Sequence, residues 1–242
     1  MTYATQPSNA ESTTADTPHG YDDLRRLMSL MTGDEKHSHS ATSTLDVLWV
    51  LYDRVLRIDP RRPDDDDRDR FLLSKGHGPM AYYAVLAARG FIDEAALRTW
   101  ARYDSTLGLH PDRNLVPGVE ISSGSLGHGL PIAVGMALGL RARGKAGPRL
   151  YCLLGDAEFD EGSNGEAIVA ASRFGLEALT AVVVDNQSSS LSWPGGIERR
   201  FAVEGWAVAT VDGRDHSALE AALTSPHPGV PLAVVAVVEP KG

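Results

Sequence analysis

Apolar and polar positions form two alternating patterns along the C-terminal half of this chain. Short apolar runs, most of them rich in valine, are typical of strands that are buried on both faces. These runs occupy residues 149–154, 181–184, 206–211 and 231–238. Between them, apolar residues recur at helical spacing near 163–174 and 215–224. This alternation predicts parallel strands joined by right-handed helical crossovers.

The N-terminal half has mostly helical patterning. Apolar residues recur at helical spacing near 21–31, 42–57, 79–89, 93–103 and 129–143. Helices that alternate with strands in one chain pack on both faces of a mainly parallel sheet. The pattern therefore predicts an α/β fold with three layers.

Composition separates a tail from the rest of the chain. Residues 1–20 are rich in Ser, Thr, Pro, Asn and Gly and have almost no apolar periodicity, so we expect a disordered tail. The chain has 242 residues, of which 43% are hydrophobic, and this is enough to build a large core. Since no linker interrupts residues 21–242, we expect one domain there.

Net charge and cysteine content limit which binding partners and which cellular compartment we expect. The net charge of -9, with the acidic run Asp64 to Asp67, offers no basic stripe for nucleic-acid phosphates. No apolar run reaches the roughly 20 residues that span a bilayer, and the start does not resemble a signal peptide. Cys152, the one cysteine, lies in an apolar run and is predicted to be buried. We expect a cytoplasmic protein that contacts neither nucleic acid nor membrane.

Polar residues follow two of the predicted strands directly. Gly155 and Asp156 come after the first run, and Asp185 and Asn186 come after the second. Parallel strands would place both pairs at one edge of the sheet, where open α/β sheets bind ligands. Carboxylate and amide oxygens suit Mg²⁺, and a glycine turn before a helix suits a phosphate. On these residues alone, a helix cap at Asp156 and a turn at Asn186 remain an equal alternative.

Four ordered motifs resemble those of the transketolase family. GDAEFDEG at 155–162, with VVDNQS ending about thirty residues later, resembles the thiamine-diphosphate motif. LLSKGHG at 72–78, the long segment 110–141 and HSHSATSTLDVLWVLY at 37–52 match further family motifs in the expected order. The resemblance covers residues 22–242 and implies the thiamine-diphosphate-binding fold, with thiamine diphosphate and Mg²⁺ as cofactors.

The resemblance assigns roles to individual residues. It implies that Asp156, the side-chain oxygen of Asn186 and the backbone carbonyl of Ser188 bind Mg²⁺, and that Gly155 and Ala157 meet the diphosphate. The family motif usually has glycine where Ala157 stands, and the methyl group is tolerated only if φ is negative.

Further roles implied by the resemblance concern the cofactor ring and the substrate. His77 would contact the diphosphate, His110 and His37 would face the substrate, and His39 is close enough to His37 to exchange with it. Glu161 would pair with its counterpart across a subunit interface. The residues that would line the cofactor rings are Gly124, Ser125 and Leu126.

The resemblance also implies a partner. Full-length family members continue beyond the point matched by VVEPKG, through a pyrimidine-binding domain. We therefore expect the N-terminal subunit of a split transketolase, in a heterotetramer of two large and two small subunits. It would transfer a two-carbon ketol unit from a ketose or ketose phosphate to an aldose acceptor.

Two alternatives stay open at this point. The chain could be the cofactor-binding subunit of a related carboligase or of an enzyme that decarboxylates 2-oxo acids. The departure at Ala157 also leaves room for a non-catalytic regulatory subunit.

Overall fold

The computed structural model describes residues 19–32, 38–76, 79–189 and 193–240, without the side chains of residues 38–41. The tail predicted at 1–20 lies outside these ranges except for its last two residues. His37, His77 and the side chain of His39 lie outside them too. Within the described ranges, no helix is both long and apolar enough to cross a membrane.

Five strands form one sheet in which every neighbouring pair is parallel. Their order across the sheet is β1-β2-β3-β5-β4. The strands are β1 (Arg70–Leu73), β2 (Leu150–Gly155), β3 (Leu179–Asp185), β4 (Ala207–Asp212) and β5 (Leu232–Val237). The prediction of a parallel sheet is therefore confirmed.

Two features of the sheet differ from the prediction. β1 was not predicted, because four residues between a charged loop and a glycine turn carry too little pattern to indicate a strand. The run at 206–211 was predicted to be buried on both faces, and this was wrong. β4 is half-exposed along its length because it pairs only with β5, at the edge of the sheet.

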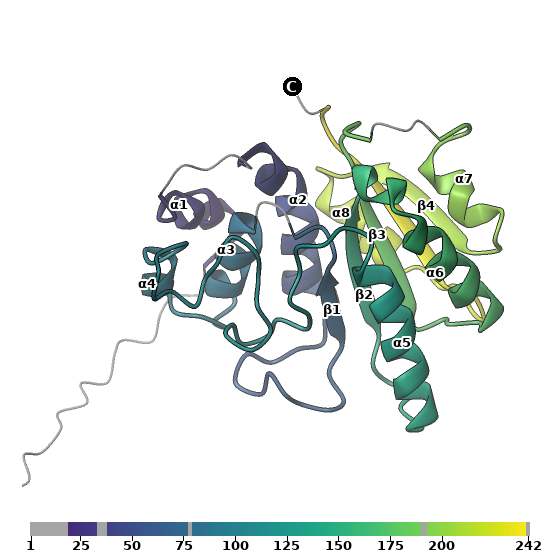
Figure 1. Ribbon diagram of the computed structural model, residues 1–242, viewed down its shortest axis with the longest axis horizontal. Coiled ribbons are helices and arrows are strands. Elements are labelled where there is room, and N and C mark those ends of the chain that lie inside the picture. The colour runs from purple at the N-terminus through teal and green to yellow at the C-terminus, as the bar shows by residue number, and fades with distance from the viewer. Residues whose placement is uncertain (1–18, 33–37, 77–78, 190–192, 241–242) are drawn as a thin grey trace, which may run out of the picture.

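Helices cover both faces of the sheet (Figure 1). Most match the predicted ranges, but the helix predicted at 93–103 is only one turn long. Its chain turns away at Ala101, which has φ 57° and donates its N–H to the carbonyl of Leu107. The helices are α1 (Leu24–Ser29), α2 (Ser38–Val50), α3 (Met80–Ala88), α4 (Glu94–Leu97), α5 (Gly129–Ala142), α6 (Gly162–Arg173), α7 (Ile197–Ala202) and α8 (His216–Leu223).

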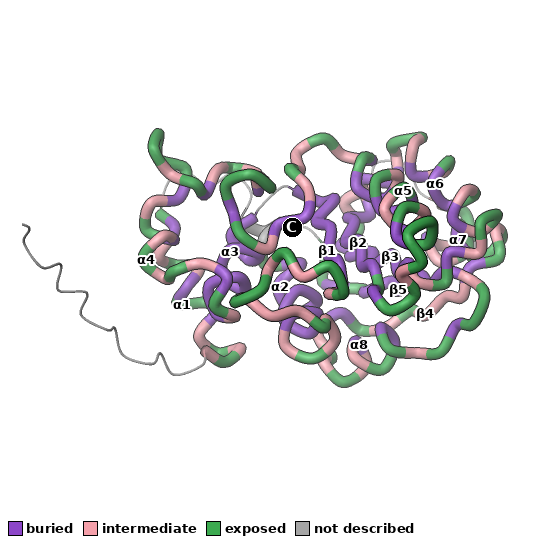
Figure 2. The backbone as a smooth tube through the Cα atoms, turned by 90° about the horizontal axis from the view of Figure 1, so that it is seen from below, coloured by how far each residue is buried: buried purple, intermediate pink, exposed green. Residues whose placement is uncertain are grey.

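The sheet separates two hydrophobic cores. Alternate residues of each strand point to opposite faces, so Leu153 packs with α1, α2, α3 and α8, while Cys152 and Leu154 pack with α5, α6 and α7. Figure 2 shows the buried residues concentrated along the strands and the helix faces turned toward them. This packing holds the carboxyl ends of β2 and β3 rigidly side by side.

We predict that Leu153→Ala destabilises the chain by about 2–5 kcal/mol, because Leu153 is fully buried at the centre of the sheet and its loss leaves a cavity. Leu115→Ala is the matched control, because Leu115 is 52% exposed. Urea unfolding followed by circular dichroism measures both free energies. Equal losses for the two variants would contradict this account of the core.

Candidate functional site

The carboxyl ends of β2 and β3 bring the first two candidate residues together. Gly155 is in register with Val184 on the neighbouring strand. Asp156 directly follows Gly155, and Asn186 comes two residues after Val184. The two residues are therefore offset by about one position along neighbouring strands, which lie about 4.8 Å apart. Both are buried, with 1% and 4% exposure. Two buried polar side chains therefore meet at this edge of the sheet.

The Asp156 carboxylate holds the loop that follows β3. It accepts hydrogen bonds from the backbone N–H of Ser188 at 2.5 Å, the hydroxyl of Ser188 at 2.6 Å and the N–H of Ser189 at 3.0 Å. Gln187, between Asn186 and Ser188, has φ 56°, a conformation that is uncommon without glycine and recurs at functional sites. The loop is thus bent sharply back onto the carboxylate.

The side-chain oxygen of Asn186 is buried and has no hydrogen-bond partner among the described residues. Leaving a buried acceptor unpaired costs about 1–3 kcal/mol. A bound cation would satisfy this oxygen, and the neighbouring carboxylate supplies a negative charge. The donor set is oxygen only, which fits Mg²⁺ better than a softer metal.

The turn after β2 is built from a glycine and a short 3₁₀ helix. An added Cβ on Gly155 would lie 2.9 Å from Cδ of Lys75, whose buried stem crosses this position. Gly155 is therefore needed for space, since its φ of -97° suits any residue. Ala157 lies within the 3₁₀ helix Asp156–Asp160 and is not among the described residues with positive φ. The φ of Ala157 is therefore negative, as its methyl group requires.

The glycine-rich segment before α5 lies beside two other predicted residues. Gly124 has φ 146°, and an added Cβ there would lie 3.5 Å from the ring of His110. Gly127 has φ 80°, and an added Cβ would lie 2.5 Å from the Cβ of Glu161. The structure thus brings His110 and Glu161 alongside the segment that contains Ser125 and Leu126.

Sequence reasoning missed Glu158, a buried carboxylate in the same turn. Its oxygens accept hydrogen bonds from the N–H of Gly127 at 2.8 Å, the N–H of Gly155 at 3.3 Å and the hydroxyl of Ser74. Burial raises the pKa of this carboxyl, against the opposing effect of its donors and of Lys75. A signal was available, because a glutamate three residues after a helix-capping position is half of a capping box.

Trp193 begins the described part of the chain after the loop that follows the site. It packs against the core of α5, α6 and α7, and the guanidinium of Arg200 lies 5.0 Å from the centre of its ring. Arg200 stacks on this aromatic face and remains exposed to solvent. Trp193 therefore has a packing role, in which it anchors the end of the loop to the core.

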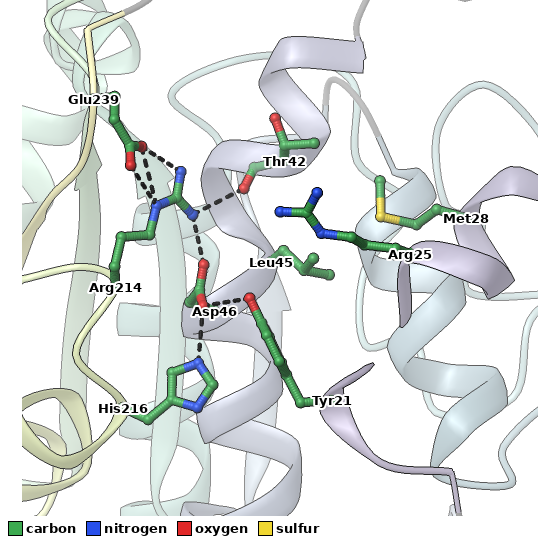
Figure 3. Close-up of a pocket in the computed structure, with 9 residues that line it drawn as sticks. All are labelled: Tyr21, Arg25, Met28, Thr42, Leu45, Asp46, Arg214, His216 and Glu239. Atoms are coloured by element: carbon green, nitrogen blue, oxygen red, sulfur yellow. Dashed lines mark hydrogen bonds and ion pairs between the residues drawn. The ribbon is translucent and has the colours of Figure 1, made fainter. Parts of the chain in front are cut away.

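A second polar cluster lies where the β4–α8 turn and the end of β5 meet α1 and α2 (Figure 3). A cavity of about 840 Å³ opens there, and the buried Asp46 of α2 lies in its wall. Asp46 accepts hydrogen bonds from the Tyr21 hydroxyl at 2.6 Å and from Arg214 at 2.5 Å, and it pairs with His216 at 2.8 Å. Arg214 also binds Glu239 through two nitrogens, at 2.6 and 3.0 Å. Asp46 thus fastens the N-terminal helices to the sheet.

Tyr21 gives this cluster a measurable pH signature. Burial, together with the neighbouring Asp46, raises the pKa of Tyr21 to about 12 from 10.0. Between pH 10 and 12 the unfolded chain has lost this proton and the folded chain retains it, so folding stability falls as the pH rises. We predict that Tyr21→Phe loses about 1.5–3 kcal/mol at pH 8, because a hydrogen bond to a charged group is removed.

The same variant should then lose less stability than the parent chain between pH 10 and 12. Denaturant unfolding at a series of pH values tests this. Tyr103→Phe is the control, since Tyr103 is fully exposed and should leave the pH profile unchanged. Parallel profiles for Tyr21→Phe and the parent chain would contradict the assignment.

Comparison with known proteins places the chain in a family. Residues 26–228 match the family model described as "Transketolase, thiamine diphosphate binding domain". The chain is 36% identical to a protein of Actinobacillus succinogenes that is named as one subunit of apulose-4-phosphate transketolase, over 83% of this chain and 75% of the relative. It is 58% identical to a Rhodococcoides fascians protein named Ferredoxin fas2, over 92% of this chain and 73% of the relative.

Solved structures agree on the fold. A transketolase variant from Pichia stipitis superposes with a TM-score of 0.76 at 24% identity, covering 90% of this chain. This chain spans only 35% of that protein's length. The superposition supports the thiamine-diphosphate-binding fold as predicted.

Proposed function

Because this chain belongs to the transketolase, thiamine diphosphate-binding domain family and is a subunit of a transketolase-type enzyme, we propose that it transfers a two-carbon ketol unit only when joined to a separate pyrimidine-binding subunit. The observation that supports cofactor binding in this proposal most directly is the unpaired, buried oxygen of Asn186 beside the Asp156 carboxylate. The Actinobacillus succinogenes relative carries the name of one subunit of its transketolase, which indicates an enzyme divided between chains. We propose a similar division here, in a tetramer of two large and two small subunits.

Each part of the site has a task in this proposal. Asp156, the oxygen of Asn186 and the carbonyl of Ser188 hold Mg²⁺, while Gly155 and the backbone of Ala157 meet the diphosphate. The loop with Gly124, Ser125 and Leu126 lines the cofactor rings. When bound, thiamine diphosphate supplies the carbon nucleophile that attacks a ketose carbonyl.

The remaining assignments concern the substrate and the interface. The ring of His110 lies beside Gly124, and we propose that His110 and His37 hydrogen-bond sugar hydroxyls, while His77 contacts the diphosphate near them. Glu161 is proposed to reach its counterpart in a second copy. The substrate class is therefore a ketose or ketose phosphate donor with an aldose acceptor.

A ferredoxin-type activity is not supported by this chain's own residues, although one relative carries that name. Iron–sulfur clusters in ferredoxins are held by four cysteine thiolates. This sequence has one cysteine, Cys152, and burial raises the pKa of its thiol well above its usual value. A buried free thiol suits a reducing compartment, and we propose the cytoplasm as the location.

We predict that Asp156→Asn weakens Mg²⁺-dependent binding of thiamine diphosphate by more than about 100-fold, since even residues behind a metal ligand contribute about 10–100-fold to metal affinity. Isothermal titration calorimetry with excess Mg²⁺ measures the change. Asp104→Asn is the matched control, because Asp104 is exposed on a loop. Unchanged affinity in a folded Asp156→Asn protein would overturn the metal assignment.

Native mass spectrometry tests the subunit proposal. We expect the chain, purified from its own cells with thiamine diphosphate and Mg²⁺ present, to carry a second chain and two cofactors per tetramer. The isolated complex should act on ketose phosphates. A folded chain that retains neither partner nor cofactor would favour the regulatory alternative, and turnover of a 2-oxo acid instead of a ketose would favour the decarboxylase.

A further inference from the structure

One buried carboxylate connects the segments that make up the proposed cofactor site. Glu158 is 1% exposed. Its side chain accepts from Ser74 at the end of β1, from Gly127 in the glycine-rich segment and from Gly155 at the end of β2. Its backbone carbonyl accepts from the side chain of Asn164 in α6 at 2.7 Å. Two segments distant in sequence, at Ser74 and Gly127, and two nearby ones, at Gly155 and Asn164, therefore converge on this residue.

The two glycines held by Glu158 adjoin different parts of the proposed site. Gly127 directly follows Leu126, the last of the residues assigned to the cofactor rings. Gly155 directly precedes Asp156, which is assigned to the metal. We infer that Glu158 is a positioning residue that fixes the distance between the ring-binding segment and the metal-binding turn. This inference rests on the proposed function.

The chemistry of the contact requires a carboxylate. All three donors point N–H or O–H groups at Glu158, and an ionised carboxylate is the side chain that offers only acceptors. A glutamine would turn its NH₂ group toward one of these donors. The Ser74 hydroxyl extends the network, because it donates to Glu158 and accepts the N–H of Gly129 at 3.0 Å.

The surrounding packing leaves little room for adjustment. An added Cβ on Gly129 would lie 2.3 Å from the Cβ of Ser74, so the segment before α5 approaches the end of β1 closely. On the other side, the Lys75 stem covers Gly155. The groups around Glu158 therefore cannot move in to replace its hydrogen bonds. Loss of the carboxylate should loosen the two glycine segments relative to each other.

We would test this with Glu158→Gln in the full chain, together with its partner where one co-purifies. Hydrogen–deuterium exchange of peptides covering 124–129 and 153–158 should become about tenfold faster, since the hydrogen bond that each segment donates to a charged acceptor is weakened or lost. The dissociation constant for thiamine diphosphate with Mg²⁺ should rise about tenfold. Exchange in α8, distant from the site, should stay unchanged.

Two further variants keep the test decisive. Glu220→Gln is the matched control, because the Glu220 side chain pairs with Arg54 at the exposed surface. Ser74→Ala removes the hydroxyl alone and covers the case in which Glu158→Gln fails to fold. If both residues act through one network, the double variant should lose less affinity than the two single losses combined.

The outcomes separate this inference from the proposed function. Unchanged exchange in both glycine segments of Glu158→Gln and Ser74→Ala would overturn the inference, whatever the cofactor affinity. A parent chain that binds no thiamine diphosphate would overturn the proposed function, and the exchange data would still decide the role of Glu158.

Discussion

The candidate site depends on the parallel pairing of β2 with β3. Because the two strands run in the same direction, a residue that ends one strand lies beside a residue that ends the other, although a whole helix separates them in sequence. An antiparallel pair would send Asp156 and Asn186 to opposite edges. The two cores on either side of the sheet make this pairing rigid, so the site is formed by the fold and not by the loops alone.

Much of this architecture could be predicted from local pattern. Continuous apolar runs indicated β2, β3 and β5 because strands buried on both faces have few polar positions to interrupt them. β1 was not predicted because it is only four residues long. The exposure of β4 could not be predicted from its own residues, because it follows from its place at the edge, which the order of the whole sheet decides.

The position of Asp156 and Asn186 at one edge of the sheet was predictable because each follows directly on a strand. Glu158 and Asp46 were missed for a common reason. Each is a buried carboxylate with partners from distant segments. The neighbouring sequence offers only a capping-box spacing at Glu158, and it does not indicate that either acid is buried. Burying a charge is costly unless donors surround it, so both residues are informative only once the tertiary contacts are known. Together they join the N-terminal helices and the glycine-rich segment to the sheet.

The single cysteine has a practical consequence. Cys152 is fully buried in β2, and the raised pKa of its thiol keeps the reactive thiolate scarce near neutral pH. The native chain should therefore react very slowly with maleimide reagents. A cysteine placed at an exposed position would carry a fluorophore or spin label with little background, so distances to a second chain become accessible without removing Cys152.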